Sequence, residues 1–226
     1  AAALPQCPLM IPAAGMPDSA SPVLKDSTGA QLPAQFVTAG GERYLAAVVP
    51  LNARNSASSF SLAANEGATK GGGGVRARTE AGAVEILIGG QPFARHNYVP
   101  GPKPYLWPLY APGQVDVTRS YPMKDVAGED QDHPHHRGLW FTHGSINGVD
   151  FWAEGEGKGK VVQRSIRTQS GPACAVVTTA NDWVAADGRK ICEDERTMVF
   201  WNTEDPRAID FCITLKATEA PLVFGD

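Results

Sequence analysis

The sequence has few charged residues and no excess of positive charge. Charged side chains make up 19% of the 226 residues, and 20 Lys and Arg stand against 24 Asp and Glu. Proteins that bind nucleic acid or anionic membrane surfaces rely on clustered positive charge. The composition therefore predicts no nucleic-acid partner.

Long apolar runs are also missing. The longest, such as residues 45–49, are far shorter than the roughly 20 residues that a membrane-spanning helix needs, so we expect no membrane insertion. The 4 cysteines form no CxxC pair and no regular spacing, which argues against a zinc knuckle or a disulfide framework. The glycine run at 71–74 lacks the spacing of a phosphate-binding loop.

Glycine and proline are plentiful instead, at 24 and 18 residues, and they divide the chain into short segments. Alternating apolar and polar residues predict strands in these segments, whereas no apolar stripe with helical spacing and caps is present. We expect hairpins at 36–49 and 75–88, then an antiparallel meander through 161–167, 174–183, 190–201 and 208–217. The predicted fold class is all-β, an antiparallel β-sandwich, with a galactose-mutarotase-like supersandwich as its more specific form.

Three regions are expected along the chain. Residues 1–30 are rich in Pro and Ala and predict an N-terminal coil, residues 31–70 a small β segment, and residues 71–226 the main sandwich. The glycine-rich stretch 63–74 predicts a flexible connection. Apolar residues continue up to residue 224, so we expect C-terminal strands outside this chain, or a partner chain, to complete the sheet.

Histidine is concentrated in one place. Four of the five histidines lie within residues 133–143. Because Pro134 disfavours helical geometry at the preceding residue, we expect an extended backbone in which His133 and His135 share a face and His136 points away. A His-x-His pair of this kind predicts a divalent metal site, with His143 or a carboxylate (Asp132 or Glu154) as the third ligand.

Two other interpretations of the cluster stay open at this point. His133, His135, His136 and Arg137 can form a metal-free acid/base or ligand-binding site, since histidine is the side chain that titrates near neutral pH. A purely structural cluster is the third interpretation. A divalent metal ion is thus the only cofactor that the sequence suggests.

Aromatic and polar side chains surround the cluster in sequence. Flat rings beside hydrogen-bonding groups match a pyranose, which offers a C–H face and a rim of hydroxyls. The predicted substrate-binding residues are Arg119, Trp107, Trp140, Asn147, Asp150 and Trp152.

Ordered sequence blocks carry a family resemblance. The blocks KPYLWPL (103–109), VTRSYP (117–122), DHPHHRGLWF (132–141) and NGVDFW (147–152) resemble the bacterial PmoA-like ("methane oxygenase PmoA") family. The resemblance covers most of the chain from about residue 30. It implies a secreted or periplasmic β-sandwich from bacteria that degrade polysaccharides. Methane oxidation is not expected, because a membrane-bound monooxygenase subunit needs spanning helices.

These observations together predict a carbohydrate-active protein. We expect it to act at a glycosidic or anomeric centre through the His-rich site, as a hydrolase, lyase or epimerase-like enzyme. The alternative is a non-catalytic carbohydrate-binding or envelope structural module.

Overall fold

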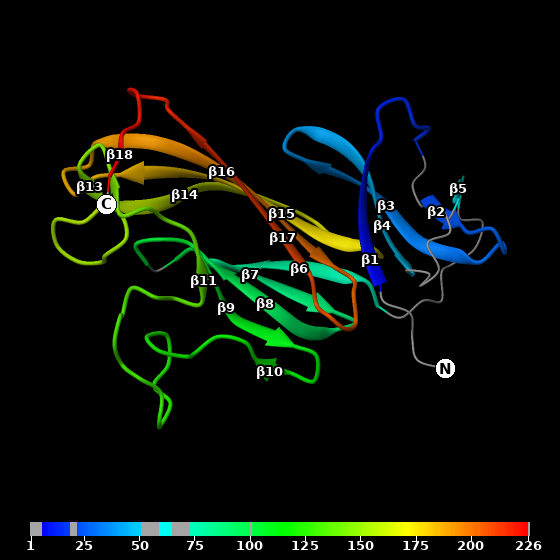
Figure 1. The fold of residues 1–226 in the computed structure, drawn as a ribbon, viewed down its shortest axis with the longest axis horizontal. Helices are drawn as coiled ribbons and strands as arrows, with labels where there is room; N and C mark the ends of the chain where they lie inside the picture. Colours follow the sequence, from blue (N-terminus) through cyan, green and yellow to red (C-terminus); the bar gives the residue numbers. More distant parts are fainter. Residues whose placement is uncertain (1–5, 19–21, 51–58, 65–72, 100, 226) are drawn as a thin grey trace.

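The computed structural model describes residues 6–18, 22–50, 59–64, 73–99 and 101–225. Within these ranges the chain forms strands, turns and loops, without a helix (Figure 1). The described residues accordingly include no helix long and apolar enough to cross a membrane. The expected all-β antiparallel sandwich is confirmed.

The N-terminal part of the chain forms a five-stranded antiparallel sheet. Its strand order is β1 (Gln6–Pro12), β4 (Glu42–Pro50), β3 (Gln31–Ala39), β2 (Pro22–Lys25) and β5 (Ser61–Ala64). β3 and β4 form the hairpin expected at residues 36–49. The predicted coil at 1–30 is wrong for β1 and β2. β1 is an edge strand, and edge strands tolerate the prolines that suggested coil because their N–H groups need not all pair.

A second sheet supplies one layer of the main sandwich. It runs in the order β10 (Val115–Asp116), β9 (Tyr105–Ala111), β8 (Gln91–Asn97), β7 (Ala83–Ile88) and β6 (Val75–Glu80). The short strand β11 (Leu139–Trp140) also pairs with β9. β6 and β7 form the second expected hairpin. The predicted flexible connection at 63–74 lies mostly outside the described residues, as does the boundary at 70/71.

The predicted meander forms the other layer. β14 (Lys160–Gln169), β15 (Cys174–Val184), β16 (Lys190–Trp201) and β17 (Ile209–Lys216) pair in chain order. β17 is at the edge of this sheet, and its half-buried Ile209 and Phe211 pack against the core. That further strands or another chain cover this edge stays a prediction. A small sheet of β13 (Val149–Asp150), β12 (Ser145–Ile146) and β18 (Phe224–Gly225) closes one end.

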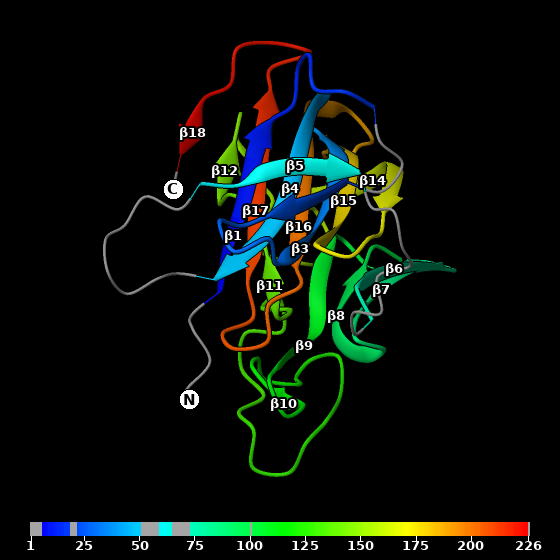
Figure 2. The ribbon, with the colours of Figure 1, turned by 90° about the vertical axis from the view of Figure 1, so that its right-hand side faces the viewer.

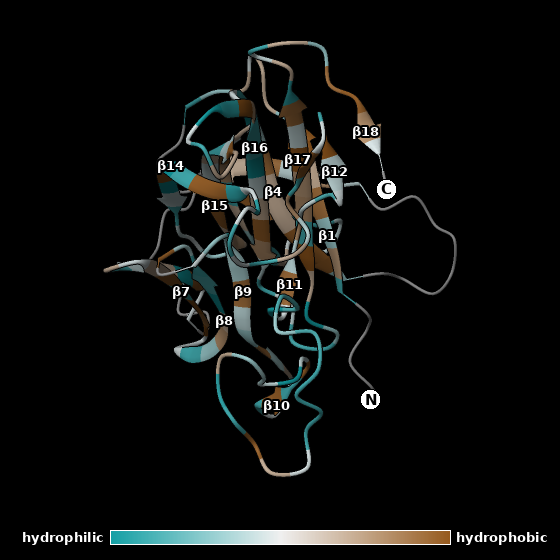
Figure 3. Ribbon diagram, turned by 90° about the vertical axis from the view of Figure 1, so that its left-hand side faces the viewer, coloured by the Kyte–Doolittle hydropathy of each residue, from teal (hydrophilic) through white to brown (hydrophobic). Residues whose placement is uncertain are grey.

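The central strands β15 and β16 pack on both of their faces. Ala175 and Met198 face the β6–β9 layer, whereas their neighbours Val176 and Val199 face the five-stranded sheet. Successive side chains of a strand point to opposite faces of the sheet, so β15 and β16 each contribute side chains to two hydrophobic cores. Figure 2 shows the five-stranded sheet in front of β15 and β16. Figure 3 shows both polar and apolar colours along the strands and mainly polar colours over the long loop between β10 and β11.

Further along β15 and β16, the face that packs against the β6–β9 layer carries polar residues in place of apolar ones. Asp194 and Arg196 are almost fully buried and form an ion pair of 2.7 Å. Asn181 and Trp183 also donate hydrogen bonds to the Asp194 carboxylate. Nearby, His96 on β8 is 2% exposed and its Nε2 lies 2.8 Å from Gln163 Oε1. The sandwich thus has an apolar half and a half with a buried polar network.

Candidate functional site

Residues 133–136 form a tight turn, which we call the His turn. The His136 N–H donates to the His133 carbonyl over 2.9 Å, and His133 has a φ of 44°. Pro134 occupies the second position of the turn, where its fixed φ is favourable. The prediction of an extended backbone at His133 and His135 is therefore wrong. The proline does exclude helical geometry at His133, but the chain takes the left-handed region instead of the extended one.

The turn brings three imidazoles together. The rings of His133 and His136 are stacked at 4.9 Å, and that of His135 lies edge-on at 4.5 Å from His136. One ring nitrogen from each histidine lies within 4.8 Å of the other two. His136 thus joins the cluster, contrary to the prediction that it points away. His143 does not: its Nδ1 accepts a hydrogen bond from the Ser145 N–H, and its ring contacts Phe224.

Arg119 anchors the base of the His turn. Its guanidinium donates to the Asp132 carboxylate over 2.6 Å, to the Asp132 carbonyl over 2.6 Å and to the His133 carbonyl over 3.0 Å. The same guanidinium holds the pKa of Asp132 below its usual range. Arg119 therefore positions the His turn. The hydrogen bonds that orient its guanidinium are made to groups of the chain itself.

Two tryptophans stand beside the turn. Trp140 on β11 and Trp152 after β13 pack with ring centroids 4.7 Å apart and planes at 61°. The Trp152 indole N–H donates to His135 Nε2 over 2.9 Å, and 43% of the residue is exposed. Asp150, predicted to bind substrate, instead accepts the backbone N–H of Trp152 and pairs with Lys158.

One buried and two half-buried charges lie beside the tryptophans. Lys103 is 2% exposed, its Nζ lies 3.7 Å from the centre of the Trp140 ring, and it donates to the Trp152 carbonyl over 3.1 Å. Glu154 pairs with Lys103 at 3.3 Å and with Arg137 at 2.8 Å. Burial lowers the pKa of Lys103, against the opposing effect of Glu154. Burial tends to raise the pKa of Glu154, but Arg137 and Lys103 together hold it below its usual value. Lys103, Glu154 and Arg137 thus satisfy one another's charges.

The environment also favours neutral imidazoles. Burial and the charge of neighbouring groups lower the pKa values of His135 and His136 from 6.5; these neighbours include the other histidines of the turn and Lys103. A lowered pKa leaves the ring unprotonated at pH 7, with a free electron pair on one nitrogen. These two histidines can accordingly accept a proton or ligate a metal.

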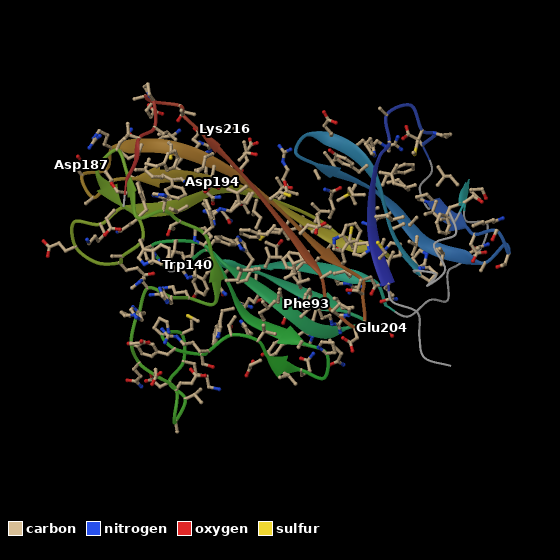
Figure 4. All side chains as sticks on the ribbon, in the orientation of Figure 1. Phe93, Trp140, Asp187, Asp194, Glu204 and Lys216 are labelled. Atoms are coloured by element: carbon tan, nitrogen blue, oxygen red, sulfur yellow. The ribbon has the colours of Figure 1, made fainter. Side chains whose placement is uncertain are left out.

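An open hollow of about 400 Å³ lies over the site. Figure 4 labels Trp140, which lies below the sheet that carries Asp194 in this view. Larger hollows of about 580 and 740 Å³ share no lining residue with it. They border the five-stranded sheet. The hollow at the His turn is lined by His136, Gly138, Trp140, Phe141, Thr142 and Trp152.

The family model for a family of unknown function, DUF6807, matches residues 83–226. This is more than half of the chain. The chain belongs to the DUF6807 family. No curated protein and no solved structure matches it.

The DUF6807 region begins at the first residue of β7 and contains the whole candidate site. The five-stranded sheet and β6 lie before it. The site is therefore built from strands and loops that the family model covers.

Two other predicted residues of the DUF6807 region serve its structure. Asn147 lies in the turn between β12 and β13, and its side chain bonds to the Pro221 carbonyl and the Val223 N–H. Trp107 lies on β9 and accepts a hydrogen bond from Asn97 at its carbonyl. Neither lines the hollow at the His turn.

Sequence reasoning missed Lys103. Lysine is almost never fully buried unless it is paired, so a lysine before a strand predicts exposure. Its partner Glu154, considered as a metal ligand, is instead held in the ion pairs with Lys103 and Arg137. The signal that was available is the density of aromatic residues in the blocks 103–109 and 147–152.

Proposed function

We propose that this protein is a carbohydrate-active protein that binds a sugar over Trp140 and Trp152 and acts at a glycosidic or anomeric centre through the His turn. The observation that carries the proposal is the aromatic pair: two indoles at 4.7 Å, one of them 43% exposed, beside three histidines. Indole faces suit the C–H face of a pyranose, and the neighbouring polar groups suit its hydroxyls.

Rigid support of the pair favours a ligand role. Lys103 is a buried charge, and burying a charge costs stability unless it is paired, as Lys103 is with Glu154. The Lys103 ammonium lies beneath the Trp140 ring and donates a hydrogen bond to the Trp152 carbonyl. Indoles held in place in this way are preorganised, which reduces the entropy lost on binding.

The chemistry at the sugar would come from the histidines. His136 lines the hollow together with both tryptophans, and its lowered pKa makes it neutral at pH 7. A neutral imidazole can take a proton from a sugar hydroxyl or from a carbon next to a carbonyl, and return it to a leaving oxygen. This role supports a hydrolase, lyase or epimerase-like reaction.

One observation favours the alternative, a non-catalytic carbohydrate-binding module. Most glycosidases use a pair of free carboxyl groups. Three carboxylates adjoin the described site and all are engaged, Asp132 and Glu154 by arginine and Asp150 by Lys158. If His136 does not transfer protons, the site binds sugar without turning it over. Export to the periplasm or the medium belongs to the same proposal. It is supported only by the resemblance of the sequence blocks to the PmoA-like family.

Binding and turnover are tested separately. Intrinsic fluorescence and melting temperature are followed while a panel of neutral, acidic and oxidised oligosaccharides is added, and product formation is followed by chromatography. We expect at least one sugar to shift both signals in the wild type, and the Trp152→Ala variant to lose the shift. Phe224→Ala is the matched control, because Phe224 is 49% exposed but contacts His143.

The outcomes separate the two functions. Turnover that is lost in His136→Gln while binding persists supports the enzyme. Binding without products in the wild type supports the binding module. No shift with any sugar, or an equal loss in Phe224→Ala, contradicts the carbohydrate proposal.

A further inference from the structure

We propose that the His turn binds one divalent transition-metal ion through His133, His135 and His136. The inference concerns the same site as the proposed function and names its cofactor, but metal binding needs no sugar. The two can therefore fail independently. The ligand set differs from the one expected from sequence, since His136 takes the place of His143.

The first support is the position of the ring nitrogens. A zinc-like ion bound at about 2.0–2.1 Å in tetrahedral geometry holds its nitrogen ligands about 3.4 Å apart. The three nitrogens in the turn already lie within 4.8 Å of one another. The side chain of His133 is 58% exposed, so modest rotations of its χ angles can close the set.

A second support is the Asp132 carboxylate, which lies next to the His133 ring. Metal-binding histidines usually donate their other N–H to a carboxylate or carbonyl, which fixes the ring and makes it a better ligand. His133 Nε2 lies 3.4 Å from Asp132 Oδ2, and Arg119 holds Asp132 in place. This leaves His133 Nδ1 to face the ion. Neither Asp132 nor Arg119 needs to move.

The hydrogen bond between Trp152 and His135 determines how readily His135 can bind the ion as its third ligand. The indole N–H can only donate, so His135 Nε2 accepts it and the proton of the neutral ring lies on Nδ1. Trp152 therefore occupies the one electron pair that His135 has to offer a metal. The ion must displace this hydrogen bond. Trp152 then competes with the metal, and removing its N–H should strengthen binding.

The donor set indicates the class of metal. Three imidazoles suit Zn²⁺, Cu²⁺, Ni²⁺ or Co²⁺ rather than Mg²⁺ or Ca²⁺, which prefer oxygen ligands. Three protein ligands leave a coordination position open, as in catalytic rather than structural zinc sites. Because His136 lines the hollow with both tryptophans, that position adjoins the proposed sugar site. A His136 that ligates the ion has no electron pair left for the proton transfer proposed above, so that role of His136 belongs to the metal-free protein.

Metal binding is measured on protein without a polyhistidine tag, after treatment with a chelator and its removal. Zn²⁺ is titrated by calorimetry, and Co²⁺ by visible absorption, without any sugar. We expect about one equivalent of Zn²⁺ and a Co²⁺ spectrum with nitrogen ligation. His133→Ala and His136→Ala should each weaken binding by more than about 100-fold, beyond the 10- to 100-fold loss typical of residues behind a ligand.

Three further variants test the arrangement. His143→Ala is the matched control and should bind as the wild type does. Asp132→Asn should weaken binding by about tenfold. Trp152→Phe should strengthen it by about fivefold, the value of one hydrogen bond of about 1 kcal/mol. Circular dichroism and melting of the metal-free proteins verify that each variant is folded.

The proposal is overturned if the wild type binds well under one equivalent, if His136→Ala binds as tightly as the wild type, or if His143→Ala loses binding. Weaker binding in Trp152→Phe overturns the competition described for His135. Sugar binding is measured in parallel with EDTA present and, separately, with one equivalent of Zn²⁺. A sugar response that survives while Zn²⁺ binding fails removes the metal alone, and Zn²⁺ binding without a sugar response in either condition removes the carbohydrate function alone.

Discussion

Buried His96 should make the stability of the fold fall as the pH is lowered from 6.5 towards 4. Burial lowers the pKa of His96 to about 4, and the charge of nearby Arg196 acts in the same direction, against the hydrogen bond to Gln163. In the unfolded chain the pKa is about 6.5. Between these two values the unfolded state binds a proton that the folded state does not. The stabilisation is therefore complete above pH 6.5 and is lost as the pH falls towards 4.

The size of the effect follows from the shift. The full pKa difference between the folded and unfolded states corresponds to about 3 kcal/mol in the free energy of unfolding. About 2 kcal/mol of this is lost between pH 7 and pH 5. Other groups titrate in the same range, among them His135 and His136. The informative quantity is therefore the difference between wild type and His96→Asn in how the free energy of unfolding changes with pH. The variant is expected to be less stable at pH 7 but to lose less stability on acidification.

Urea unfolding followed by circular dichroism, in EDTA at pH 7.5, 6.5, 5.5 and 5.0, gives both curves. The contribution of the His turn is common to both proteins and cancels. His96 Nδ1 is buried without a hydrogen-bond partner in the described part of the chain, which gives the protonated ring little compensation. If the two proteins lose equal stability between pH 7 and pH 5, the reasoning about His96 is refuted.

Four other substitutions, two of them combined in one variant, have defined outcomes. Arg196→Met should destabilise the fold by about 3–5 kcal/mol in chemical unfolding, because it leaves the buried Asp194 carboxylate unpaired, whereas Asp194→Leu combined with Arg196→Met should cost less than Arg196→Met alone. Lys103→Met keeps the aliphatic stem but removes the ammonium beneath Trp140, so fluorescence should show a changed indole environment and sugar binding should weaken; an unchanged spectrum would contradict the supporting role. Gly138→Ala should lower the melting temperature, since this residue has a φ of 61° and an added Cβ would lie 2.3 Å from the Leu106 carbonyl oxygen; a melting temperature equal to that of the wild type would show that β9 can move away.

Much of the fold could be predicted because local signals and tertiary packing agree. The meander from β14 to β17 has both period-2 alternation and turn residues between its strands, so two independent signals indicate the same elements. β1 was missed because proline is a reliable indicator of coil only where a strand has partners on both sides, and β1 is an edge strand. β2 lies between β3 and β5, and its proline is the first residue of the strand, a position that strands also tolerate. Their pairing depends on β4 and β3, which are distant in the sequence.

The place of the candidate site could be predicted, but its geometry could not. The density of histidine indicated the segment in which three imidazoles come together. The backbone at His133 is decided by the turn to His136 and by the anchor from Arg119, and neither contact can be read from neighbouring residues. Polar residues such as Asn147 and Asp150 have the composition of a sugar site, yet the backbone groups that they bind are revealed only by the folded chain.

The contacts of Arg119 close the loop between β10 and β11 at its neck, and Glu129 reinforces the closure by accepting the N–H groups of Ser120 and Tyr121. The contacts that close the neck are made by Arg119 and Glu129, outside residues 125–128 at the tip of the loop. Lengthening this tip would add only the entropy of a longer closed loop, about 0.6 kcal/mol for each doubling. Residues 125–128 are therefore where a fluorescent reporter or an affinity peptide can be inserted with the site intact, and where length can drift in evolution without consequence for the three imidazoles.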